Sequence, residues 1–328
     1  MSGYAERLGL NIMQATEAAA LVAGRWVGRG DALAADQAAA EAMQSILNTA
    51  PMDGLIVIGE EQRHTEQTRL ITGTPIGNRE GPSLDVVVDA VEGVELLAEG
   101  LPDAVSLVAL APRGAMRSLA PSAYLEKLVV GAEAAHAVGP EALNAPAAWT
   151  LGVVARATGK AVRDLTVFVL KRARHESLIE EIRLAGARVI LRTAGDVVGA
   201  LLAAMPGSGV DVLMGTGGTA EGVVAACAVK ALGGVIFGRL APQSNEERRG
   251  VLEAGLDLNQ VFSGGELVAS DDVFFAATGI TDGLLLKGVL YGANSATTHS
   301  LALRGGSASG IRRQIYTEHP AEPPTAYA

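Results

Sequence analysis

The alternation of apolar and polar positions predicts helices first and buried strands after them. Apolar residues recur at helical spacing over 11–27, where Gly-Arg-Gly-Asp at 28–31 breaks the run, and a second helix is predicted over 35–47. Short apolar runs at 54–59 and 85–89, bounded by Gly or Asp, are typical of buried strands. The amino-terminal part is therefore expected to combine helices with a sheet.

The middle of the chain has weaker patterns. Sheet strands are predicted over 105–110 and 116–119, on either side of a Pro-Arg-Gly turn at 112–114. The segment 61–81 is polar and irregular, and 139–150 is rich in Ala and Pro. We interpret 139–150 as a linker.

Beyond this linker, apolar runs of strand length alternate with amphipathic stretches of helix length. The predicted strands are 165–170, 188–191, 210–214 and 235–237, and the predicted helices are 176–185, 197–205 and 221–232. Alternation of this kind implies parallel strands joined by crossover helices.

These patterns predict an α/β protein, with a mixed sheet in the N-terminal half and a mostly parallel sheet in the C-terminal half. We expect an α+β domain over 1–150 and an α/β domain over 151–316, whose end can return to the first domain. The Pro- and Glu-rich segment 317–328 is expected to be a flexible tail.

Composition and charge narrow the partners and the compartment. The formal charge of −10 disfavours nucleic-acid and anionic-membrane partners, and the 4% of aromatic residues disfavours a base-stacking surface. The single cysteine, Cys227, excludes a disulfide within the chain and a thiolate metal site. With no signal-peptide pattern and no run of about 20 apolar residues, we expect a cytoplasmic protein that does not span a membrane.

Acidic residues stand where apolar strands end. Glu60 follows the first predicted strand, Asp89 ends the next, and Glu92 comes three residues later before Gly93. Any one of these acids could equally cap a helix or face solvent. Asp89 and Glu92 together, directly after an apolar strand, favour a metal site, and carboxylate oxygens suit Mg²⁺ or Mn²⁺.

Two further segments have the composition of phosphate-binding sites. The glycine-rich stretch 215–221 joins a predicted strand to a predicted helix, so its backbone N–H groups could hold a phosphate beside Glu221. The basic cluster 171–175 contains Arg172 and Arg174, which suit a second phosphate. A plain geometric turn explains the first segment equally well, and a solvated basic turn the second. No His-x-x-x-His pair and no Gly-x-Ser-x-Gly elbow occurs, which disfavours zinc-hydrolase and serine-hydrolase chemistry.

Segments along most of the chain match the pattern of a known family. The chain resembles the class II fructose-1,6-bisphosphatases, bacterial enzymes related in fold to the inositol monophosphatases. The matching segments run in order from about residue 11 to 313: Trp26-Val-Gly-Arg-Gly-Asp31, Asp36-Gln-Ala-Ala, Ile56-Val-Ile-Gly-Glu60, Asp85-Val-Val-Val-Asp89-Ala-Val-Glu92-Gly93, Tyr124-Leu-Glu-Lys-Leu-Val-Val-Gly131, Gly217-Gly-Thr-Ala-Glu-Gly-Val223 and Ala277-Thr-Gly-Ile-Thr281.

The resemblance implies a layered α/β/α/β/α fold, dependence on Mg²⁺ or Mn²⁺, and a homodimer or homotetramer. It places the metal ligands, all acidic here, at Asp36, Glu60, Asp89, Glu92 and Glu221. It places the sugar-phosphate contacts at Gly93, Val94, Tyr124, Arg172, Arg174, Asp196 and Gly218. The first predicted domain would then bind the metal and the second the substrate.

The departures from the family pattern concern the reaction rather than the metal. The family's Thr, whose hydroxyl orients the attacking water, is Val94 here, and a catalytic-region Lys is Ala32. An Asp expected near the sugar hydroxyls is Ala194. With these groups gone, Glu61 and Asp31 are candidates of equal standing for orienting the water.

We therefore expect a metal-dependent phosphatase acting on fructose 1,6-bisphosphate or a related ketose or cyclitol phosphate. The missing hydroxyl predicts a slow or redirected enzyme, in a specialised pathway. Two alternatives stay open from the sequence: isomerisation or elimination at the same metal site, and a catalytically weakened regulator that binds sugar phosphates.

Overall fold

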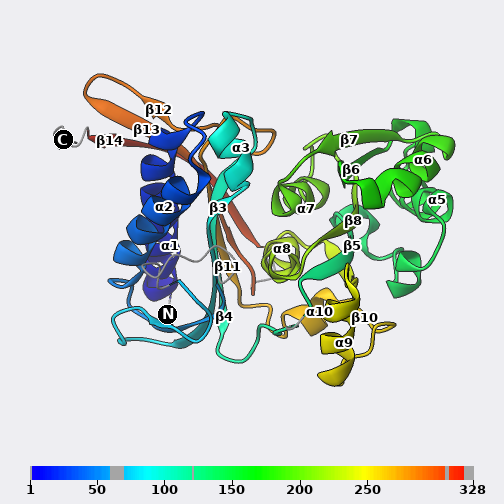
Figure 1. Cartoon of the computed structure of the whole chain (residues 1–328), viewed down its shortest axis with the longest axis horizontal. Helices are drawn as coiled ribbons and strands as arrows, with labels where there is room; N and C mark the ends of the chain where they lie inside the picture. The colour runs from blue at the N-terminus through cyan, green and yellow to red at the C-terminus, as the bar shows by residue number, and fades with distance from the viewer. Residues whose placement is uncertain (1, 60–69, 120–121, 307–309, 321–328) are drawn as a thin grey trace. The chain divides into compact units, whose positions relative to one another are not determined.

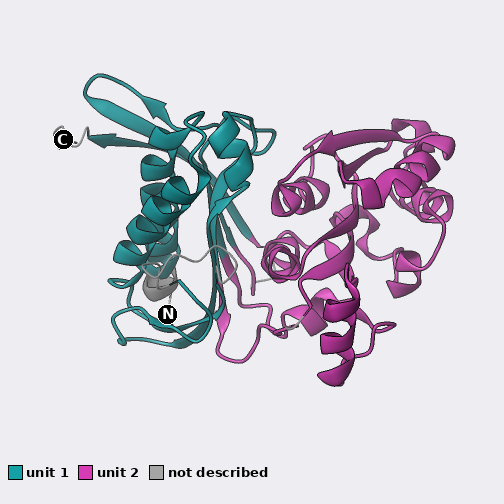
Figure 2. Cartoon of the chain, viewed as in Figure 1, with its two compact units in different colours: residues 1–109, 275–303, 311–328 teal, residues 110–274, 304–310 magenta. Residues whose placement is uncertain are grey.

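A computed structural model describes residues 2–59, 70–119, 122–306 and 310–320 (Figure 1). The chain divides into two compact units (Figure 2). Unit 1 comprises residues 1–109, 275–303 and 311–328, and unit 2 comprises residues 110–274 and 304–310. The predicted boundary lies at 150, whereas the chain enters the second unit after residue 109. The C-terminal strands belong to the sheet of the first unit, a return that the prediction allowed.

Unit 1 places two long helices against its sheet (Figure 1). Helix α1 (Ser2–Ala23) packs along α2 (Ala32–Leu47), and both contact strand β3 (Ser83–Glu92). Their buried faces are rich in Ala, which lets the helices approach one another and the sheet closely. A short helix, α3 (Val94–Glu99), follows β3 directly.

The sheet of unit 1 has eight strands in the order β12-β13-β11-β4-β3-β1-β2, with β14 also paired to β13. The pairing of β1 with β3 is parallel and that of β1 with β2 antiparallel, so the predicted mixed sheet is confirmed. Besides β3, the strands are β1 (Asp53–Ile58), β2 (Pro75–Ile76), β4 (Val105–Pro112), β11 (Phe274–Gly279), β12 (Leu290–Tyr291), β13 (Ser295–Arg304) and β14 (Ile311–Pro320).

The sheet of unit 2 has six strands in the order β10-β9-β5-β8-β6-β7. Strand β6 is parallel to both β7 and β8, as the alternating pattern predicts, and the α/β class is confirmed. Strand β5 lies between β8 and β9 and is antiparallel to both, and β10 is antiparallel to β9. This sheet is therefore mixed, and the prediction that it is mostly parallel was wrong. The strands are β5 (Tyr124–Val130), β6 (Thr166–Leu170), β7 (Arg188–Arg192), β8 (Val212–Gly218), β9 (Val235–Leu240) and β10 (Val261–Ser263).

Helices cover both faces of this second sheet (Figure 1). Helices α7 (Asp196–Ala204) and α8 (Thr219–Ala231) contact one face, and α5 (Ala147–Thr158) and α6 (Glu176–Leu184) build a core on the other. Because side chains alternate along a strand, each central strand contributes apolar residues to both layers. The remaining helices of this unit include α4 (Ala132–Ala135), α9 (Asn245–Glu253) and α10 (Gly264–Leu267).

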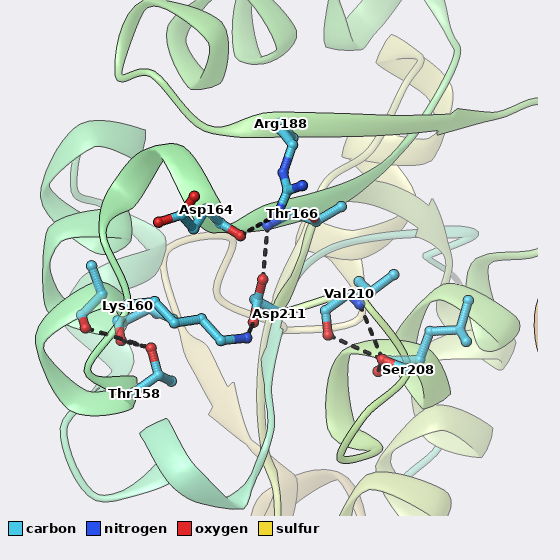
Figure 3. A network of polar contacts seen from close by, with 11 residues as sticks. Thr158, Lys160, Asp164, Thr166, Arg188, Ser208, Val210 and Asp211 are labelled. Atoms are coloured by element: carbon cyan, nitrogen blue, oxygen red, sulfur yellow. Dashed lines mark hydrogen bonds and ion pairs between the residues drawn. The ribbon is translucent and has the colours of Figure 1, made fainter.

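Polar contacts tie together the amino ends of the parallel strands (Figure 3). Asp211, just before β8, forms an ion pair with Lys160 at 2.5 Å and accepts the backbone N–H of Thr166 at 2.8 Å. The Arg188 guanidinium donates to the carbonyl of Asp164 at 2.5 Å. This edge is thus fixed by structural contacts, and the carboxyl ends at the opposite edge remain for a functional site.

The weakly patterned segments are where the local predictions were wrong. Residues 116–119 form only an isolated bridge, from Met116 to Val268, because no neighbouring strand continues the pairing. The predicted linker contains a 3₁₀ helix (Pro140–Leu143) and the start of α5. Residues 317–320 of the predicted tail belong to β14. Among the described helices, none combines the length and the apolar character needed to cross a bilayer.

Candidate active site

The start of α2 places two of the predicted site residues in unit 1. The exposed carboxylate of Asp31 caps the helix, since its Oδ1 accepts the backbone N–H of Ala34 at 3.0 Å. Asp36 lies about one turn further along and is only 4% exposed. Ala32, at the first helical position, is half-buried. Asp31 therefore has a structural task, while Asp36 faces the interior.

The junction between β3 and α3 holds most of the other predicted residues of unit 1. Asp89 is half-buried in β3, and the strand continues to Glu92, which is 5% exposed, rather than closing after Asp89. Gly93 caps α3 with φ of +85°, a left-handed conformation that favours glycine. Val94 is half-buried at the first turn of the helix. The predicted ligand, the turn and the substituted Thr position are thus consecutive at one junction.

The donor chemistry of these residues fits a hard divalent cation. Asp36 and Glu92 are carboxylates with little exposure, and carboxylate oxygens are the ligands that hard divalent cations prefer. Glu60 and Glu61 lie outside the described residues. Within the described part of the chain, no three His, Cys, Asp or Glu side chains form a group that could hold a metal ion. The five-ligand set stays a prediction.

In unit 2, the carboxyl ends of the parallel strands gather the predicted substrate contacts. Arg174 follows β6, and its Nη2 and Nε donate to the carbonyl of Thr216 at 2.8 and 3.2 Å. The same guanidinium lies over the ring of Tyr124, 5.2 Å from its centroid. Tyr124 is paired in register with Gly218 across β5 and β8. Arg172, two residues before Arg174, is exposed on the same turn.

His175 holds the backbone of the same residue, Thr216, through its N–H. Its Nδ1 lies 2.7 Å from the carbonyl of Leu170, so Nδ1 carries the hydrogen and donates it. Its Nε2 then accepts the backbone N–H of Thr216 at 2.7 Å. Burial lowers the pKa of His175 below its ordinary value of 6.5, which keeps the ring neutral in this arrangement.

A buried lysine connects the last two predicted substrate positions. Lys127 is 2% exposed, forms an ion pair with Asp196 through its Nζ, and donates to the carbonyl of Gly218 at 2.9 Å. Asp196 is the first residue of α7, and Gly218 is the last of β8. A Cβ on Gly218 would overlap the carboxylate of Glu221, which therefore lies directly beside this strand end.

The structure brings some predicted residues together and separates others by unit. Tyr124, Arg174, Asp196, Gly218 and Glu221 form one connected group in unit 2. Asp31, Asp36, Asp89, Glu92, Gly93 and Val94 belong to unit 1.

Sequence reasoning missed the supporting roles of Lys127 and His175. A signal for Lys127 was available, because a lysine within the run Leu125-Glu-Lys-Leu-Val-Val130 requires a partner if the strand is buried. His175 was read only as part of a basic cluster. Its hydrogen bonds depend on a strand end far away in sequence, which local patterns do not reveal.

Comparison with known proteins finds relatives that match nearly the whole chain. A profile of the family described as bacterial fructose-1,6-bisphosphatase, glpX-encoded, matches residues 6–319. A protein of Escherichia coli (strain K12) named fructose-1,6-bisphosphatase 1 class 2 is 40% identical over 319 residues, covering 93% of each chain. A fructose-1,6-bisphosphatase class 2 of Shigella flexneri matches with the same identity and coverage.

Proposed function

This chain belongs to the class II family of bacterial fructose-1,6-bisphosphatases, and we propose that it hydrolyses a phosphate monoester of fructose 1,6-bisphosphate or of a related ketose or cyclitol phosphate. The family makes it a sugar-phosphate phosphatase, a phosphoric monoester hydrolase that depends on a metal. The observation that carries the proposal is the 40% identity over 93% of the chain. It favours hydrolysis over isomerisation, elimination or a purely regulatory role.

The metal site is proposed to use the five acidic positions Asp36, Glu60, Asp89, Glu92 and Glu221, with Mg²⁺ or Mn²⁺ as the ion. The low exposure of Asp36 and Glu92 supports this role. When bound, divalent ions stabilise negative charge on a phosphate and make a coordinated water more acidic.

The substrate's sugar and its distal phosphate are proposed to bind at the carboxyl ends of β6, β7 and β8. Arg172 and Arg174 supply guanidinium groups for the phosphate, and Tyr124 supports Arg174 from below the guanidinium plane. Two N–H groups of Arg174 donate to the carbonyl of Thr216, which fixes the orientation of the guanidinium group. Asp196 and the backbone of Gly218 are proposed to contact the sugar, and Gly93 and Val94 the phosphate that is cleaved.

The water-orienting step is where this chain departs from its family. Val94 has the shape of the family's Thr and lacks its hydroxyl, and Ala32 lacks the family's ammonium group. We propose that Glu61 or Asp31 orients the water instead. Asp31 already caps α2, so using it for catalysis would draw its carboxylate away from the N–H of Ala34. Losing a water-orienting hydroxyl typically lowers the rate on the order of 10²-fold, which predicts slow turnover.

We further propose a homodimer or homotetramer located in the cytoplasm: the family resemblance predicts the assembly, and a single cysteine suits a reducing compartment.

The proposal is tested by measuring phosphate release from a panel of sugar mono- and bisphosphates with Mn²⁺ or Mg²⁺. Glu92→Gln should abolish release, because it removes a charged ligand and keeps the side chain's shape. Glu95→Gln, an exposed acid on α3, is the matched control and should retain the wild-type rate. Absence of phosphate release from every member of the panel with either metal would refute the proposal.

A further inference from the structure

We propose that Lys127 is a positioning residue of the substrate site, which fixes the carboxylate of Asp196 and the carbonyl of Gly218 relative to one another. The inference rests on the proposed function, because Asp196 and Gly218 are its proposed sugar contacts. It assigns a role to a residue that lies beneath the site.

Lys127 joins three elements at one point. It is on β5, a central strand of the sheet, and its side chain is 1% exposed. Its Nζ pairs with Asp196 Oδ2 at the start of α7 and donates to Gly218 O at the end of β8, 2.9 Å away. One ammonium group therefore sets the spacing between a helix start and a strand end.

The backbone of β8 lies so close to the ion pair of Lys127 and Asp196 that these side chains have little room to move. A Cβ on Gly217 would overlap Asp196 Oδ2 and would lie 3.0 Å from Lys127 Nζ. Glycine at this position lets the strand end lie directly against the ion pair. A shift of the Asp196 carboxylate is thus limited by β8 on one side and by Lys127 on the other.

A purely stabilising role is the competing explanation. Buried ion pairs contribute little net stability compared with apolar pairs of the same volume, since both charges lose their hydration. Retaining a buried lysine beneath two proposed sugar contacts is therefore better explained by the geometry that it imposes. The two roles differ in what they predict for substrate affinity.

The test is a double-mutant cycle between Lys127→Met and Asp196→Asn. For each variant, KM and kcat are measured with fructose 1,6-bisphosphate, and the Kd for fructose 6-phosphate is measured by calorimetry. Lys127→Met should raise KM and Kd on the order of 10-fold, with a smaller change in kcat. In the Asp196→Asn background the same substitution should change KM and Kd less than about 2-fold, because Lys127 acts through Asp196. Lys127→Arg, which keeps the charge, should recover part of the lost affinity.

Lys230→Met is the matched control in the same unit. Lys230 is also largely buried, and its Nζ bridges the carbonyl of Val268 at 2.7 Å and Asp271 at 3.0 Å. It should lower thermal stability without changing KM. If Lys127→Met does not fold, Gly217→Ala tests the same geometry with the lysine in place, and should raise KM through displacement of Asp196.

The inference is overturned if Lys127→Met leaves KM and Kd unchanged, or if its effect on them adds fully to that of Asp196→Asn. It is likewise overturned if a folded Gly217→Ala binds fructose 6-phosphate as the wild type does. If the wild type binds fructose 6-phosphate but releases no phosphate from any substrate of the panel, the proposed function is refuted. The Kd for fructose 6-phosphate then still tests the role of Lys127. A wild type that does neither would refute both.

Discussion

Replacing Gly218 with alanine should displace the carboxylate of Glu221 and leave the fold intact. Gly218 has φ of −68° and ψ of 152°, a conformation that alanine adopts without strain. The added methyl group would lie 2.7 Å from Glu221 Oε1 and closer still to Oε2, whereas real Cβ atoms keep at least 3.0 Å. The obstructing atoms are at the end of a flexible side chain, so the carboxylate can move and the backbone need not.

The size of the effect follows from that displacement. Relieving the overlap requires Glu221 to move by on the order of 1 Å, and a misplacement of that size at a reacting site can cost about 100-fold in rate. The corresponding loss of transition-state stabilisation is about 2.7 kcal/mol. Disturbing a metal site's supporting geometry typically weakens metal binding 10- to 100-fold. Since no backbone strain is introduced, the free energy of unfolding should fall by less than about 1 kcal/mol.

The assay is kcat/KM for fructose 1,6-bisphosphate across a Mn²⁺ titration, with urea unfolding of the same preparations. Gly218→Ala should need more Mn²⁺ for half-maximal rate, and excess metal should restore part of the activity. Gly152→Ala in α5 is the control, because its Cβ would meet only Arg156 Nη1, at 3.6 Å. A Gly218→Ala variant with wild-type activity and metal dependence would refute the role of Glu221 as a ligand.

Three further predictions follow from the same sites. Val94→Thr restores the hydroxyl at the first turn of α3 and should raise the bisphosphatase rate on the order of 10-fold or more, whereas an unchanged rate would show that another group orients the water. Because burial holds the pKa of His175 below its ordinary value of 6.5, the folded state takes up this proton less readily than the unfolded state. Its contribution to stability should be complete above about pH 6.5 and decline at lower pH. In urea unfolding, His175→Gln should therefore lose less stability than the wild type between pH 7 and 5; an equal loss in both proteins would contradict this. Chelation should abolish phosphate release and lower the unfolding temperature, and Mn²⁺ should restore both; a chelated protein that keeps full activity would contradict metal dependence.

Local patterns in the sequence predicted the elements of unit 2 well. The strands over 165–170 and 188–191 and the helix over 176–185 lie within a residue of β6, β7 and α6. These elements succeed one another along the chain, so their periodicity and their turns carry the information needed. Strand β5 was missed, because its pairing with β8 and β9 joins segments about 80 to 115 residues away.

The unit boundaries could not be predicted for a similar reason. Strands β11, β12, β13 and β14 complete a sheet whose other strands lie before residue 113. Nothing in the local composition of 274–320 shows that these strands pair with segments so distant. The candidate site residues came mainly from the family resemblance, whereas the contacts of Lys127 and His175 required the structure.

The most direct test of the account is to locate Mn²⁺ by anomalous scattering in crystals of the protein grown with the metal and fructose 6-phosphate. We expect anomalous peaks at about 2.0 to 2.3 Å from carboxylate oxygens of Asp89, Glu92 and Glu221. Sugar density should lie against Asp196 and Gly218. Ordered Mn²⁺ bound elsewhere, with these carboxylates free of metal, would contradict it.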